Sequence, residues 1–331
     1  MKTIAFFNNK GGVGATTLVY HLAWMFADMG RDVIAADLDP QSNLTSMFLD
    51  EDRLEELWPD DKHPNTIYGV VEPILRGIGD IQAPHVEDIA TEMGSGALGL
   101  IAGDLALSGF EDKLSDAWPR CHNRDESAFR TMTAFYRAIL MAAEQRGAEL
   151  VLIDVGPNLG AINRAALIAS QYVVIPLASD LYSLQGLRNL GPQLGLWREA
   201  WGELRGKSPD PDLPLPSGDM RPAGYVVMQH ATRAERPVKA YLRWMDRIPN
   251  EYCRSVTDEP RDVNVRVEND PYCLAALTHY RSLMSLAMEA RKPMFRLKPA
   301  DGAIGAHAQA VSDCNNDFHA LARRILAAIG A

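Results

Sequence analysis

A glycine-rich loop near the start of the chain constrains its fold more than any other feature. Residues 9–17 read Asn-Lys-Gly-Gly-Val-Gly-Ala-Thr-Thr and lie between a short apolar run and a segment with helical spacing. Gly11, Gly12 and Gly14 let backbone N–H groups turn inward, and the start of the helix adds its positive dipole end. A strand, loop and helix in this order are typical of a phosphate-binding loop.

The rest of the chain repeats the strand and helix pattern. Short apolar runs without a period of two occur at residues 4–7, 33–36, 150–153, 172–175 and 225–228. Strands that are covered on both faces have this character. The segments between them have helical spacing, as in residues 16–29, which end at Gly30. The pattern predicts an α/β fold with a doubly wound, mostly parallel sheet flanked by helices.

Two stretches interrupt this alternation. Residues 50–66 are acidic and contain proline, and residues 206–222 are rich in proline, which cannot donate a hydrogen bond in a central strand. We interpret both as surface insertions in a single domain that covers residues 1–331.

Acidic residues follow two of the predicted strands. Asp37 and Asp39 come after the second apolar run, and Asp154 follows the hydrophobic run at 150–153. Acids at these strand ends can face a metal–phosphate centre, and Thr16 is placed to ligate Mg²⁺ through its hydroxyl. The sequence therefore predicts a site for ATP and Mg²⁺, with Thr16 and Asp154 on the metal side.

Three segments together resemble the ParA/MinD ATPases, which share a deviant Walker A motif. Residues 10–17 resemble that motif, residues 37–43 resemble the family's D-x-D-P-Q-x-N segment, and residues 156–160 resemble its switch. The resemblance implies an ATPase that closes as a nucleotide-sandwich homodimer. It implies that Lys10 touches the partner's phosphates, that Asp39 positions the attacking water, and that Asp37 holds the magnesium shell.

The same resemblance suggests the residues that bind the nucleotide. Phosphate contacts are expected from the loop, and base contacts from one strand end and from a later Arg-Ile-Pro-Asn segment. The candidates are Lys10, Gly11, Gly12, Val13, Gly14, Ala15, Thr16, Thr17, Gln229, Pro249 and Asn250.

Ala15 departs from the family pattern, in which a lysine at this position donates to the β- and γ-phosphates. The absence of that lysine should weaken nucleotide binding. It should impair phosphoryl transfer more strongly, because charge builds on the phosphoryl oxygens in the transition state. The intact remainder of the motif favours an engineered replacement of lysine, and a natural loss is the alternative.

Three functions fit these motifs. The first is a ParA-like switch, in which ATP closes a dimer that binds DNA or a protein partner such as a ParB-like activator, and hydrolysis releases it. The second is a non-hydrolysing nucleotide-binding module that acts as a scaffold or regulator. The third is an ATP-dependent ligase on the same fold, although we find no motif for its second substrate.

The net charge of −10 argues against general nucleic-acid binding, so DNA would need a local basic patch. A helix opened by Pro237 is predicted to carry such a stripe, although a solvated face is the slightly favoured interpretation. The residues of the stripe are Arg233, Arg236, Lys239, Arg243 and Arg247. The amphipathic C-terminus, residues 318–329, is expected to pack on the core rather than bind a membrane. Scattered cysteines and the lack of a signal peptide predict a cytoplasmic protein.

Overall fold

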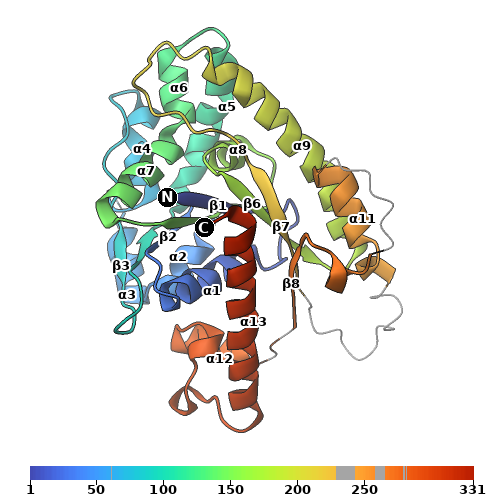
Figure 1. Cartoon of the computed structure of the whole chain (residues 1–331). Helices are drawn as coiled ribbons and strands as arrows, with labels where there is room; N and C mark the ends of the chain where they lie inside the picture. Colours follow the sequence, from blue (N-terminus) through green and yellow to red (C-terminus); the bar gives the residue numbers. More distant parts are fainter. Residues whose placement is uncertain (61, 229–242, 258–264, 279, 281) are drawn as a thin grey trace.

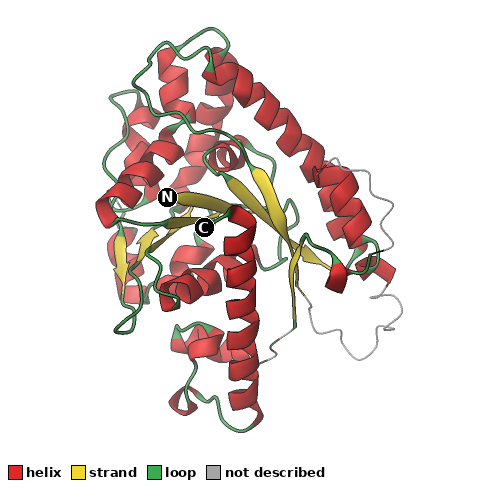
Figure 2. Cartoon of the chain, viewed as in Figure 1, coloured by secondary structure: helices red, strands yellow, loops and turns green. Residues whose placement is uncertain are grey.

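The computed structural model describes residues 1–60, 62–228, 243–257, 265–278, 280 and 282–331. An eight-stranded sheet has the order β3-β4-β2-β5-β1-β6-β7-β8, and every neighbouring pair is parallel except β3 with β4. This arrangement, seen in Figure 2, confirms the predicted α/β fold. The strands are β1 (Lys2–Phe6), β2 (Val33–Asp37), β3 (Glu87–Ile89), β4 (Leu98–Ile101), β5 (Leu150–Asp154), β6 (Tyr172–Ala178), β7 (Arg221–Met228) and β8 (Cys273–Leu277).

Helices cover both faces of the sheet (Figure 1). One layer contains α1 (Ala15–Asp28), α12 (Leu283–Ala290) and α13 (Ala306–Ile329). The opposite layer contains α4 (Ile67–Arg76), α5 (Phe110–Cys121), α6 (Glu126–Met132), α7 (Ala134–Arg146), α8 (Ala161–Ile168) and α9 (Leu181–Arg205), with α11 (Ile248–Tyr252) beside it. The short helices α2 (Asn43–Phe48) and α3 (Glu51–Leu57) follow β2.

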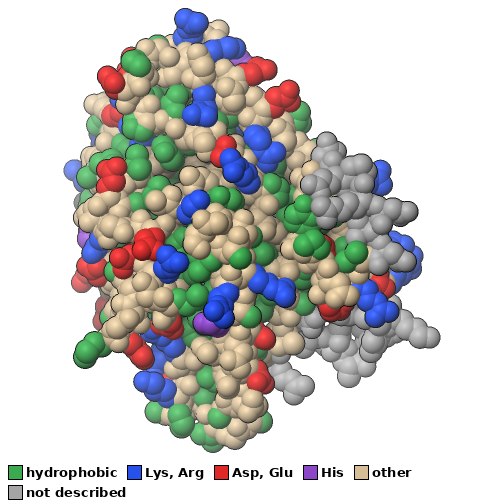
Figure 3. Space-filling model, viewed as in Figure 1, with side chains coloured by type: hydrophobic (Ala, Val, Ile, Leu, Met, Phe, Trp, Pro, Cys, Tyr) green, Lys and Arg blue, Asp and Glu red, His purple; other side chains and the backbone are tan. Residues whose placement is uncertain are grey.

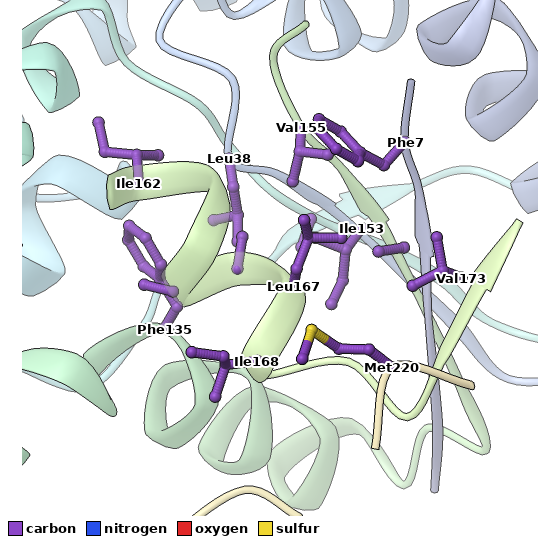
Figure 4. Packing of buried hydrophobic residues seen from close by; sticks show 14 of the residues in the cluster. Phe7, Leu38, Phe135, Ile153, Val155, Ile162, Leu167, Ile168, Val173 and Met220 are labelled. Carbon is purple, nitrogen blue, oxygen red and sulfur yellow. The ribbon is translucent and has the colours of Figure 1, made fainter. Parts of the chain in front are cut away.

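Alternation along β1 divides the core between these two layers. Ile4 and Phe6 pack with the α1 side, whereas Ala5 and Phe7 pack with the α8 side. Figure 4 shows Phe7 among the side chains of the second layer, near Ile153 and Val155, with Leu167 of α8 below them. Because both faces are apolar, the strands have no polar alternation in sequence, which is why their runs are recognisable.

Three strands of the sheet, β3, β4 and β8, were not predicted from the sequence. β4 is only four residues long and contains Gly99, and β3 is a polar edge strand with the sequence Glu-Asp-Ile. β8 reads Cys-Leu-Ala-Ala-Leu, which has too few β-branched residues to indicate a strand.

The prediction that residues 206–222 stay out of a central strand was wrong at their end. Arg221 and Pro222 begin β7, which lies between β6 and β8. A proline near the first residue of a strand costs little, and the register of β6 with β7 shifts just after it, between Val173 and Val174. The preceding loop is also partly internal, because Leu213 and Met220 are buried and Trp201 Nε1 donates to the Pro216 carbonyl at 3.0 Å.

The C-terminal helix packs as the sequence predicts. α13 buries Phe318, Leu321, Ile325 and Ile329 in the same cluster as the apolar residues of α1. Tyr172 in β6 donates its hydroxyl hydrogen to the Ile329 carbonyl at 3.1 Å, so the end of the helix is fixed to the sheet. Across the described part of the chain, we find no helix with the length and apolar character needed to cross a bilayer.

Candidate functional site

The glycine-rich loop connects β1 directly to α1. Gly12 and Gly14 have φ angles of 74° and 86°, which residues with a Cβ rarely adopt. At Gly14 a Cβ would also lie 3.0 Å from Cε of Met228. Asn8 connects the loop to β6. Its Nδ2 donates to the Pro176 carbonyl at 2.6 Å, and its Oδ1 accepts from the Lys10 N–H at 3.1 Å. Sequence analysis did not identify Asn8 as part of the site.

A cavity of about 630 Å³ opens at this loop. Gly11, Gly12, Val13, Gly14, Ala15, Thr16 and Thr17 line it together with Lys10 and Asp39. The predicted phosphate loop and one of the predicted acids therefore share one concave surface. Its volume falls within the usual range of small-molecule sites, about 300–1,000 Å³.

Sequence analysis missed the remaining walls of this cavity. Tyr20 and His21 contribute from α1, and Met47 contributes from α2. The C-terminal segment adds Met284, Ala287, Met288, Arg291 and Lys292. No local pattern marks these residues, because they reach the cavity through the packing of α12 near α1.

Lys10 lies at the edge of the loop in an ion pair with Asp180. The Asp180 carboxylate also accepts from the Ser183 N–H at 2.8 Å and caps α9. These contacts hold the pKa of Asp180 below its usual range, although burial opposes them. The side chain of Lys10 is 28% exposed, and its Nζ lies 5.8 Å from the centre of the Tyr182 ring. Lys10 is therefore held at the surface rather than inside the loop.

Asp37 and Asp154 are paired residues at the ends of β2 and β5. Both are fully buried, and neither lines the cavity. The Thr45 N–H and hydroxyl donate to one Asp37 oxygen at 2.8 and 2.7 Å. The other Asp37 oxygen and both Asp154 oxygens have no hydrogen-bond partner among the described residues.

This burial changes the ionisation of the two acids. Loss of solvent raises the pKa of Asp37 to about 7, with the nearby Asp39 adding to the effect and Thr45 opposing it. Burial raises the pKa of Asp154 well above its usual range, and Asp37 adds to this, whereas the nearby Thr16 hydroxyl lowers it. Buried carboxylates with unpaired oxygens next to a phosphate loop fit a bound cation and its water shell.

Asp39 and the segment after β5 meet at the same edge of the sheet. Asp39 Oδ1 accepts from the Gln41 N–H at 3.0 Å, and a Cβ on Gly156 would lie 3.0 Å from that oxygen. Asn163 in α8 donates to the Gly156 and Asn158 carbonyls at 2.5 and 2.7 Å. The segment is thus tied to α8 at one end and close to Asp39 at the other.

Several predicted residues do not join this cluster. Gln229 lies outside the described residues, as do Arg233, Arg236 and Lys239 of the basic stripe. Pro249 and Asn250 belong to α11 and do not line the cavity, so their contact with a base stays a prediction. Arg243 and Arg247 are exposed, and each lies 5.3 Å from the Trp244 ring.

His21 connects the loop's helix to the C-terminal segment. Its Nδ1 lies 2.7 Å from the Thr17 carbonyl, and its Nε2 lies 3.1 Å from the Met294 N–H. The ring is fully buried and stacks on Phe318 in α13. For Nε2 to accept from Met294, the proton must be on Nδ1, so this contact requires a neutral imidazole.

Acid should therefore destabilise the fold through His21. Burial lowers its pKa to about 4 from 6.5, so the unfolded chain takes up the proton first. The stabilising contribution is complete above pH 6.5 and is lost as the pH falls toward 4. At about pH 5 the loss should be about 2 kcal/mol. Urea unfolding of the native protein and His21→Gln at about pH 7 and pH 5 checks this, and an equal pH dependence in both would contradict it.

A parallel sheet with a glycine-rich loop between β1 and α1 and acids at the ends of β2 and β5 defines the P-loop class of nucleotide-binding folds. A family model described as AAA domain matches residues 1–201. The chain belongs to this family and, within it, to the ParA/MinD type.

Curated relatives show the same relationship. Sporulation initiation inhibitor protein Soj of Bacillus subtilis is 30% identical over 190 residues, which are 57% of this chain and 63% of Soj. Protein IncC of Escherichia coli is 28% identical over 190 residues, which are 57% of this chain and 44% of IncC. The match thus spans less than two thirds of either relative.

Solved structures agree with the fold. Protein DIP2308 of Corynebacterium diphtheriae has a TM-score of 0.70 at 24% identity, with 99% of this chain and 98% of that chain covered. An ATP complex of an McdA variant from Cyanothece has a TM-score of 0.63 at 15% identity, with coverage of 100% and 96%. The ParA of pNOB8 bound to nonspecific DNA has a TM-score of 0.58 at 16% identity, with coverage of 99% and 98%.

Proposed function

We propose that this chain is an ATP-dependent switch. Two copies close around bound nucleotide, the closed dimer binds DNA or a protein partner, and hydrolysis resets the cycle. The observation that carries this proposal is the cavity at the loop, which places Gly11–Thr17, Lys10 and Asp39 on one surface.

The position of Lys10 supports a role between two copies. Its ammonium group lies at the surface and pairs with Asp180, which is itself partly exposed. Both side chains are about one third exposed or less, so the ammonium group would exchange Asp180 for a partner's phosphate at the edge of the loop rather than in the core. Tyr182, which is 72% exposed, lies beside Lys10 and offers the same face an apolar contact.

The chain's own acids would organise the reacting groups. Thr16 and the unpaired oxygens of Asp37 and Asp154 would hold Mg²⁺ and its water shell, directly or through water. The metal ion, when bound, neutralises charge on the phosphates. Asp39 lines the cavity and would orient the attacking water.

Light scattering of the purified chain with and without Mg-ATP tests the switch. We expect the molar mass to double with ATP in the Ala15→Lys protein, and Lys10→Ala in that background should prevent the change. A mass that stays monomeric with ATP after Ala15→Lys would rule out the dimerisation switch.

A second function is favoured by Ala15. Without the lysine, the chain could retain a nucleotide as a structural ligand and serve as a scaffold or regulator. This alternative predicts nucleotide carried through purification and negligible turnover, even after Ala15→Lys. Recovered hydrolysis in that variant would exclude it.

DNA binding makes a separate prediction at Arg243. The similar pNOB8 ParA structure contains nonspecific DNA, and Arg243 lies in the described part of the basic stripe. On the face drawn in Figure 3, basic side chains are scattered among acidic and apolar ones. We expect a partial loss at one arginine, because the stripe contains several basic residues. We expect Arg243→Glu to reduce ATP-dependent DNA retention in a gel shift by roughly threefold or more. The control is Arg323→Glu on α13, which should leave retention unchanged, and an equal shift for native protein and Arg243→Glu would remove the stripe from the proposal.

A further inference from the structure

The cavity contains cations that come from outside the glycine-rich loop. Among the described residues that line it, the basic side chains are Lys10, Arg291 and Lys292, and the acid is Asp39. Lys10 is paired with Asp180 at the surface. Arg291 and Lys292 are therefore the cations that the chain's own C-terminal segment brings to the nucleotide cavity.

The segment that carries them is fixed to the loop's helix. The Met294 N–H donates to His21 Nε2, and His21 Nδ1 contacts the carbonyl of Thr17, the last residue of the phosphate motif. Met294 comes two residues after Lys292. This short chain of hydrogen bonds connects the segment that carries the cations to the helix of the loop. In Figure 1, α12 lies on the α1 side of the sheet, and apolar residues of both helices belong to one buried cluster.

The present partners of both cations can be exchanged. Lys292 Nζ lies 2.7 Å from a carboxylate oxygen of Asp301, in a pair whose lysine and aspartate side chains are 42% and 13% exposed. Arg291 donates to the Leu49 carbonyl, and its other nitrogen lies 3.7 Å from Glu51, whose side chain is 88% exposed. The long pair of Arg291 with the exposed Glu51 is weak. A phosphate offers several charged acceptor oxygens to both cations, and arginine can contact these oxygens in pairs.

We propose that Arg291 and Lys292 supply the positive charge that Ala15 cannot give to the phosphates of a nucleotide bound in the loop. This inference rests on the proposed nucleotide-binding function. It assigns the two residues a binding role that offsets the missing lysine, with His21 as the residue that positions their segment. The ligand class is a nucleoside polyphosphate, because the loop and both cations line one cavity, and backbone N–H groups, arginine and lysine are all ligands for phosphate oxygens.

Calorimetry with Mg-ATP tests the assignment in two backgrounds. The variants are Arg291→Met and Lys292→Met, alone and together, in the native chain and in Ala15→Lys. In the native chain the double change should weaken binding by about tenfold to a hundredfold. With Ala15→Lys the same change should cost at most a few-fold, because the loop then has its own cation.

Two control variants separate charge from folding. Lys292→Arg keeps the charge and should keep the affinity, and Lys298→Met removes an exposed lysine that does not line the cavity. Equal affinity for the native chain and the double variant would overturn the inference and leave the nucleotide site intact. Absence of ATP binding in both the native chain and Ala15→Lys would overturn the proposed function as well. A loss of the same size in both backgrounds would show that the cations do not substitute for the lysine.

Discussion

Replacing Ala15 by lysine is expected to raise ATP turnover by at least about a hundredfold, since each 1.4 kcal/mol of transition-state stabilisation is worth about tenfold. Ala15 is the first residue of α1 and lines the cavity, so a lysine there would extend from the helix start toward the phosphates. The affinity for ATP should rise less, by about tenfold, because Arg291 and Lys292 would already contribute charge in the ground state.

Phosphate release and calorimetry on the same preparations measure the two effects separately. Ala15→Met is the matched control, because it adds side-chain length without charge and should restore neither quantity. Adding Asp39→Ala to Ala15→Lys should remove the gained turnover while leaving ATP binding. Turnover that stayed at the native level in Ala15→Lys would mean that the loop lacks more than its lysine.

The second large effect is expected at the buried acid pair. Asp37→Asn should raise the free energy of unfolding of the nucleotide-free protein by about 1–3 kcal/mol near pH 8. The change removes a negative charge that is buried away from water, and it places an amide donor toward Asp154. The same change should weaken Mg²⁺-dependent ATP binding, because one unpaired carboxylate oxygen is lost. Greater stability and weaker binding should therefore appear together.

The pH dependence of this effect has a definite sign. The folded-state pKa of Asp37, about 7, lies above its ordinary value of 3.8, so the folded protein holds the proton more tightly. The destabilisation by the charged Asp37 carboxylate is therefore absent below pH 3.8, grows as the pH rises, and is complete above pH 7. The gain from Asp37→Asn should follow this window. Urea unfolding across the range measures it, with exposed Asp60→Asn as a control that should change stability by less than about 0.5 kcal/mol. A variant less stable than the native protein at every pH would contradict the expectation.

The sequence predicts the centre of the fold better than its edges. The strands β1, β2, β5, β6 and β7 are recognisable because both of their faces are apolar. β3 and β4 are short, and β3 lies at an edge where polar residues are tolerated. The prediction at Pro222 was wrong because the cost of a proline in a sheet depends on its position within the strand, and the residue type alone does not give that position.

The candidate site divides in the same way. Its loop and acids follow strands directly in sequence, so local order predicts that they converge. Arg291 and Lys292 are far from the loop in sequence and reach the cavity through contacts of α12, α13 and His21. Such contacts depend on how helices pack across the sheet, and no spacing rule predicts them. The base contacts proposed at Pro249 and Asn250 depended on resemblance alone, and these residues lie away from the cavity wall.

The pairing of β1 has a consequence for how the protein is made. The strand that carries the glycine-rich loop has β5 and β6 as its neighbours, beginning with the pairs Lys2 with Leu150 and Ile4 with Tyr172. A nascent chain therefore exposes the loop sequence early, but the strand has no neighbour until residues 150–178 have left the ribosome. An N-terminal fragment that stops before Leu150 would contain every residue of the loop and still be unable to hold its shape.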